Sequence, residues 1–137
     1  MGRSVAAVVI GFVVIGVLAF GTGAAVQAAM PGAFGPGGST SDPAILLATL
    51  AYVTLFAVAG CYLAARLAPR RPMAHALVLG VLGLLFNVAG TIATWSAYPA
   101  WYHVTALLLV MPSAWLGGWL RERELGRRAA PMATVPA

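Results

Sequence analysis

The sequence has few charged residues and little from which a polar surface could be built. Only 8% of its 137 residues are charged, lysine does not occur and acidic residues number three, whereas 61% of the residues are hydrophobic. An average soluble protein carries roughly 25% charged residues. A soluble fold of this size would lack the side chains to cover its surface. The composition therefore predicts a single-domain protein that has the lipid bilayer as its solvent.

Several classes of chemistry are excluded by what is missing. Cys61 is the only cysteine, so an internal disulfide, a CxxC motif and a cysteine metal cluster cannot form, and quinone-linked disulfide enzymes do not fit. The apolar runs hold no carboxylate, which small multidrug exporters need inside the membrane, and proton-coupled transport in general needs an ionisable group there. No nucleophile, base and orienting group fall together, and phosphate-cradling motifs are absent. We predict no catalytic residue, no metal, no cofactor and no enzyme activity.

Four long hydrophobic runs occupy residues 5–29, 44–65, 73–95 and 101–120. About 20 helical residues cross the hydrocarbon core, so each run is a candidate transmembrane helix. Asp42 and Pro43 are typical of a helix N-cap followed by the first helical residue, and Pro72 and Pro99 mark later helix starts. Pro112 lies inside the last run and predicts a kink. The first run is longer than the apolar core of a secretory signal, roughly 7–15 residues, so we expect it to be kept.

The connections after the second and third runs are short, which makes successive helices antiparallel. The fold class predicted from this pattern is all-α, a transmembrane antiparallel four-helix bundle over residues 1–120. Residues 121–137 form a basic tail that begins with charged side chains and ends in a disordered segment containing proline and alanine.

All eight arginines fall on one side of the predicted bundle, and none falls on the other. The positive-inside rule makes that side cytoplasmic, with both termini inside. Because the arginines stand between apolar runs, we expect no nucleic-acid partner. They can bind anionic lipid headgroups, or they can serve only to fix the topology. The candidates for headgroup contact are Arg66, Arg70, Arg71, Arg121 and Arg123.

Small residues form stripes along the helices, and close helix contacts in lipid are made by such residues. The clearest stripe is in the third run, and shorter ones occur in the others. We expect them to face the bundle interior, with a homo-oligomer interface as the alternative. The stripes are Ala76, Gly80, Gly83, Asn87, Gly90, Thr91 and Thr94 in the third run; Gly16, Ala19, Gly23 and Gln27 in the first; Ala57, Gly60, Cys61 and Ala64 in the second; and Ser113 and Gly117 in the fourth.

Polar side chains within the runs are few. Asn87 lies near the middle of its run and needs a hydrogen-bond partner such as Thr91 or a group on a neighbouring helix. We interpret it as a packing clamp, whose interhelical hydrogen bond contributes roughly 0.5–2 kcal/mol. The alternative is a solute path lined by Asn87, Thr91 and Thr94.

Two histidines begin the third and fourth runs, at opposite membrane faces. His75 and His103 should lie roughly 30 Å apart, which excludes a shared haem or metal site within one chain. Each is expected to be an interfacial histidine, and each is a weak candidate for an axial ligand to a pigment held with a partner chain. Trp95, Tyr98, Trp101 and Tyr102 are typical of an aromatic belt that anchors helices at the outer headgroups.

Three segments resemble those of a known group of proteins. They are YLAARLAPRRPMAHAL at residues 62–77, PAWYH at 99–103, and AWLGG at 114–118 before Arg121. The segments are similar to those of uncharacterised small four-span membrane proteins of bacteria with GC-rich genomes. The resemblance implies the four-span topology and a bacterial origin, and it implies no activity.

The sequence favours a non-catalytic membrane protein, an accessory or scaffold subunit of a larger membrane complex. The alternative is a small oligomeric channel or carrier for a neutral or lipid-like solute. The expected partners are the lipid bilayer and either another membrane protein or further copies of the chain.

Overall fold

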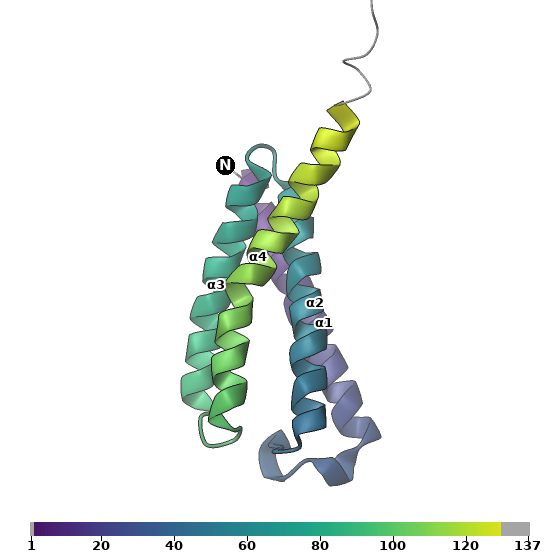
Figure 1. The fold of residues 1–137 in the computed structure, drawn as a ribbon, viewed down its shortest axis with the longest axis vertical. Coiled ribbons are helices and arrows are strands. Elements are labelled where there is room, and N and C mark those ends of the chain that lie inside the picture. Colours follow the sequence, from purple (N-terminus) through teal and green to yellow (C-terminus); the bar gives the residue numbers. More distant parts are fainter. Residues whose placement is uncertain (1, 130–137) are drawn as a thin grey trace, which may run out of the picture.

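A computed structural model describes residues 2–129 as four long helices packed against one another (Figure 1). The helices are α1 (Gly2–Ala29), α2 (Pro43–Leu67), α3 (Pro72–Ala93) and α4 (Ala100–Ala129). Two short 3-10 turns, Pro31–Ala33 and Pro36–Gly38, lie in the connection between α1 and α2. All four helices are long and apolar enough to cross a membrane. The predicted fold class, an all-α bundle of membrane-spanning helices, is confirmed.

The helix boundaries follow local chemistry at most of the ends. Asp42 caps α2 as predicted, because its carboxylate accepts hydrogen bonds from the backbone N–H groups of Ala44 and Ile45 at 2.8 and 3.4 Å. Pro72 is the first residue of α3. That helix ends at Ala93, two residues before the predicted boundary. There the Thr94 N–H bonds to the Gly90 carbonyl and the chain then turns.

The predicted C-terminal tail, residues 121–137, begins as helix. α4 runs on through Ala129, so the first nine residues of that segment belong to α4. The remaining part, 130–137, for which the sequence predicts disorder, lies outside the described residues. The helix also passes through Pro112 without a break, and it changes direction in its middle third (Figure 1).

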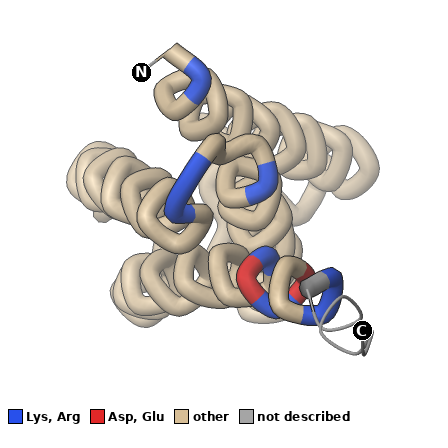
Figure 2. The backbone as a smooth tube through the Cα atoms, turned by 90° about the horizontal axis from the view of Figure 1, so that it is seen from above, with Lys and Arg blue, Asp and Glu red and all other residues tan. Residues whose placement is uncertain are grey.

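The four helices do not form a symmetric ring. α1 packs mainly on α2, whereas α4 packs on both α2 and α3. The start of α1, the end of α4 and the α2–α3 connection lie together at one end of the bundle, at the top of Figure 1. Figure 2 looks down on this end and shows that it carries the arginines. We call it the arginine end; the opposite end carries the α1–α2 connection and the α3–α4 turn.

Ile45, Leu46 and Leu50 of α2 are buried near the far end, but the main cluster of buried residues lies in the half of the bundle nearer the arginine end. It consists mostly of small side chains, namely Cys61, Ala64, Ala65, Ala76, Leu79 and Ala114. Glycines allow the backbones to approach closely there. A Cβ atom on Gly11 would lie 2.8 Å from the Gly60 carbonyl oxygen, and one on Gly117 would lie 2.7 Å from the Cβ of Cys61. Small residues therefore set the helix spacing in this half.

The predicted small-residue stripes face the interior in α2, in α4 and in the first part of α3, whereas Gly90 and Thr94 of the α3 stripe are exposed. Gly60, Gly80 and Gly117 are all buried. In α1 the close contact comes from Ala7 and Gly11, which the predicted stripe does not include. That stripe, from Gly16 to Gln27, lines cavities instead.

Candidate ligand-binding cavity

The half of the bundle opposite the arginine end contains a cavity of about 440 Å³ that is open on one side, where the exposed rings of Phe20 and Phe86 line it. Side chains from all four helices line it, together with Tyr98 of the α3–α4 turn. Cavities of roughly 300–1,000 Å³ are typical of small-molecule sites. The helices are closely packed in one half and separated in the other, so the cavity ends against the glycine-rich core.

The lining of this cavity changes in polarity along the bundle axis. Near the core it is mostly apolar, with Phe12, Leu79 and Val110, and the Ser113 hydroxyl there donates to the Leu109 carbonyl. Toward the far end it carries hydroxyl, amide and imidazole groups from Asn87, Thr91, Thr94, Tyr98, Tyr102 and His103. None of the lining residues is acidic or basic apart from His103. The site is therefore suited to a molecule that is largely apolar and has a small uncharged polar part.

A second cavity, of about 420 Å³, lies between α1, α2 and their connection. Tyr98 and Tyr102 line both cavities and form part of the wall between them. The Tyr98 hydroxyl donates a hydrogen bond of 3.4 Å to the Gly38 carbonyl. This bond joins the α3–α4 turn to the α1–α2 connection at the end of the bundle.

His103 is buried, with 3% of its surface exposed. The imidazole stacks on Trp95 at a centroid distance of 5.3 Å, and the rings of Tyr98 and Tyr102 meet it at 6.0 and 5.9 Å. Its Nε2 atom is buried, and no described residue supplies a hydrogen-bond partner. A buried polar atom left without a partner costs about 1–3 kcal/mol. The position of this histidine at the membrane interface stays a prediction, and the structure adds that the aromatic rings of the turn and of α4 enclose the side chain.

The predicted polar path in α3 lies on the cavity wall. Asn87 and Thr91 are half-buried there, and the Thr94 hydroxyl donates to the Gly90 carbonyl at 2.8 Å. The interpretation of Asn87 as a packing clamp stays a prediction. Sequence reasoning missed Tyr98 and Tyr102, which it assigned to the aromatic belt. A residue at this depth can belong to an aromatic belt or can line a cavity, and its position in the sequence does not distinguish the two. The direction in which its side chain points decides between them.

His75 lies at the arginine end, at the start of α3. Its Nδ1 is 3.1 Å from the Arg71 carbonyl oxygen, so the ring caps the local backbone. The two histidines are therefore at opposite ends of the bundle. Within residues 2–129 no group of three or more histidine, cysteine or carboxylate side chains could hold a metal ion.

The candidate headgroup arginines fall into two sets. Arg66, Arg70 and Arg71 are exposed around the α2–α3 connection. Arg121 pairs with Glu124 at 2.7 Å, and Arg123 lies over the Trp119 ring at 4.5 Å. The second set is thus engaged within α4, and the first is the set that is free to meet anionic headgroups.

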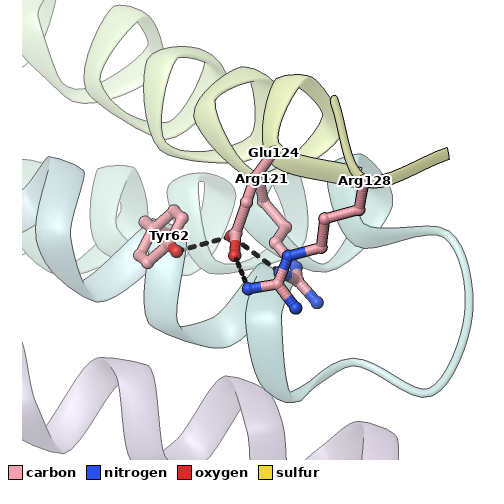
Figure 3. A network of polar contacts seen from close by, with 4 residues as sticks. All are labelled: Tyr62, Arg121, Glu124 and Arg128. Atoms are coloured by element: carbon pink, nitrogen blue, oxygen red, sulfur yellow. Dashed lines mark hydrogen bonds and ion pairs between the residues drawn. The ribbon is translucent and has the colours of Figure 1, made fainter. Parts of the chain in front are cut away.

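Glu124 is the centre of a polar network at the arginine end (Figure 3). Tyr62 of α2 donates a hydrogen bond of 2.7 Å to its carboxylate, and Arg121 and Arg128 form ion pairs with it. The hydrogen bonds from Tyr62 and Arg121 lower the pKa of Glu124 from 4.5 to about 2. The network joins the C-terminal extension of α4 to α2.

Comparison with protein-family models, with curated proteins and with solved structures finds no match for this chain.

Proposed function

We propose that the protein is a non-catalytic multi-pass protein that binds or carries a neutral, lipid-like solute in the cavity. The observation that carries the proposal is the uncharged cavity of about 440 Å³, apolar toward the core and polar at the far end. A phosphate or carboxylate headgroup would find no basic side chain other than His103 there. An alkyl or prenyl chain would meet aliphatic and aromatic side chains.

The proposed location is the bacterial inner membrane, with both termini in the cytoplasm. The positive-inside rule supports this orientation, since the arginines gather at one end of the bundle (Figure 2). The polar end of the cavity would then lie at the outer headgroup level. A solute with its polar part there would have the same orientation as a lipid of the outer leaflet.

A second candidate is the accessory or scaffold subunit of a larger membrane complex. This candidate is favoured by the side of the cavity that lies between α1 and α3. These two helices pack only weakly on each other, because α1 packs mainly on α2. Phe20 and Phe86, which line the cavity, are 84% and 64% exposed. A transmembrane helix of a partner, or of a second copy, would cover these rings.

The test is mild extraction from native membranes, followed by sizing and mass spectrometry of the bound lipids and proteins. The proposal predicts a stoichiometric neutral lipid-like molecule. A cavity-filling variant, Gly90→Leu, should lose it, because a Cβ at Gly90 has nothing within 4 Å and enters the cavity. Gly21→Leu is the matched control, since Gly21 is equally open but does not line either cavity.

The outcomes separate the candidates. A stoichiometric protein partner without a bound lipid would favour the accessory subunit. A chain that folds, keeps no small molecule and has no partner would contradict both. Asn87→Leu gives a further reading: loss of the bound solute with normal insertion supports a solute contact, whereas loss of folding supports the packing clamp.

A further inference from the structure

We propose that His103 recognises the ligand, and that this ligand is an amphiphile with one hydrocarbon chain and an uncharged, hydrogen-bonding head. The inference rests on the proposed function and adds to it the ligand's chemical class and the residue that selects its head. It follows from the size of the cavity, its depth, the absence of charge and the environment of His103.

The size of the cavity matches a ligand with one chain. A volume of about 440 Å³ lies toward the lower end of the range for small-molecule sites, and a diacyl phospholipid is far larger than this. A single alkyl or prenyl chain with a small head fits.

The depth of the cavity matches one membrane leaflet. His103 lies at its polar end, and Ser113 of the same helix lies at its apolar end. These ten helical steps span about 15 Å at 1.5 Å per residue, which is half of a hydrocarbon core of about 30 Å. A bound chain would run from the headgroup level toward the middle of the bilayer.

The head must be uncharged, because the lining offers no fixed counter-charge. The arginines are at the other end of the bundle (Figure 2), and the one carboxylate near the polar end, Asp42, is engaged as the cap of α2. A phosphate or carboxylate brought into this cavity would lose its hydration without gaining an ion pair.

Among the polar groups of the lining, His103 is the one with a buried atom that has no hydrogen-bond partner in the described residues. The hydroxyls of Tyr98 and Thr94 already donate to backbone carbonyls, whereas Nε2 of His103 is paired with no described residue. The imidazole plane turns about a soft terminal torsion. Because Nε2 is covered by protein atoms, a turn of the ring about this torsion brings it to the cavity, where a ligand hydroxyl or carbonyl at the polar end pairs with it.

The experiment uses the full chain in nanodiscs of zwitterionic lipid and measures both binding and thermal stability. The neutral probes are oleyl alcohol, monooleoylglycerol and a prenylated benzoquinone, and oleate is the charged match of oleyl alcohol. We expect at least one neutral probe to bind and oleate to bind much more weakly. If the alcohols bind more tightly than the quinone, the recognised head carries a hydroxyl. If the quinone binds more tightly, the recognised head carries a carbonyl.

The decisive variant is His103→Phe, which keeps an aromatic ring and removes both nitrogens. We expect about tenfold weaker binding of the neutral probe, the equivalent of one buried hydrogen bond. The unliganded variant should melt at the same temperature or higher, because an unpaired polar atom has been removed. Thr105→Val is the control; its hydroxyl bonds to the Trp101 carbonyl and it lines neither cavity.

Each contrary result has its own meaning. If His103→Phe lowers the stability and leaves the affinity unchanged, His103 is a packing residue and the inference fails, although binding that Gly90→Leu abolishes would keep the proposed function. If oleate binds as tightly as oleyl alcohol, the uncharged head is wrong. If no probe binds to the wild-type chain, both the inference and the proposed function are overturned.

Discussion

Arg71 is the non-glycine residue with a left-handed backbone in the described chain, with φ 51° and ψ 65°. It precedes α3 in the short connection from α2, where the chain must reverse its direction within four residues. A non-glycine residue in this conformation is strained by roughly 1–2 kcal/mol, and asparagine tolerates it better than most others. Reversing the chain at this connection therefore costs backbone strain at Arg71.

The strain at Arg71 predicts the effect of a substitution. Arg71→Asn should raise the free energy of unfolding by up to about 1 kcal/mol, since the new side chain relieves part of the backbone strain. Arg70→Asn removes the same charge from an adjacent exposed position with φ outside the left-handed region, and it should give no gain. Thermal unfolding in detergent compares the two, and equal changes in both variants would contradict the prediction.

At the scale of the helices, the contact of α1 with α2 depends on two facing glycines. A Cβ on Gly11 would lie 2.8 Å from the Gly60 carbonyl oxygen, which is backbone and cannot rotate away. Gly11→Ala should therefore destabilise the bundle by about 1–3 kcal/mol, as overpacked cores do.

Gly16 provides the matched control for this contact. It lies in the same helix, and a Cβ there has nothing within 4 Å. Gly16→Ala should be neutral, or stabilising by about 0.5–1 kcal/mol through helix propensity. Unfolding measured for both variants in the same detergent is the test. A Gly11→Ala protein as stable as Gly16→Ala would show that α1 and α2 are farther apart than described.

The Glu124 network predicts how the C-terminal extension of α4 responds to pH. The folded-state pKa of this carboxyl is lowered to about 2, so the stabilising contribution is complete above the ordinary value of 4.5 and is lost as the pH falls toward 2. Protection of the backbone amides of residues 121–128 against hydrogen exchange, corrected for intrinsic rates, should be constant from pH 7 to 5 and fall below pH 4.

Glu124→Gln should reproduce the low-pH state at pH 7, because it removes the charge that Arg121 and Arg128 bind. Glu122→Gln is the control, since this neighbouring carboxylate is exposed and lies outside the network. If both variants leave the amides of α4 equally protected, packing alone holds the extension against α2.

At the scale of the whole molecule, the arrangement of charge predicts which end faces the cytoplasm. In a Cys61→Ala background, Ser41→Cys should react with a membrane-impermeant maleimide in intact cells, because it lies at the end opposite the arginines. Arg70→Cys should react only after permeabilisation. Both positions are exposed, so burial does not account for a difference. The reverse pattern would overturn the proposed orientation.

The helices themselves could be predicted from the sequence. Hydropathy located all four, and the Asp42–Pro43 and Pro72 starts are as expected, because capping and proline chemistry are local. The end of α3 and the extension of α4 were less predictable. Ala93 is followed by residues that hydropathy treats as a continuing span, and the charged residues after 120 are stabilised by the contact of Glu124 with Tyr62.

Part of the candidate site was also predictable. The stripe that contains Asn87 and Thr91 was expected to face the interior, and both residues line the cavity. The inward direction of Tyr102 and the enclosure of His103 were not, because α4 bends and its rotation relative to the α3–α4 turn depends on packing against two other helices.

The sequence by itself determined the environment of this protein, the number and extent of its apolar helices and the gathering of arginines at one end. These properties depend on composition and on interactions within a few residues. Only the tertiary structure decided where the helices approach and where they separate. The Gly11–Gly60 and Gly117–Cys61 contacts close one half of the bundle, and the cavity opens in the other. Helix packing in lipid depends on how surfaces fit, and that fit is set by all four helices together.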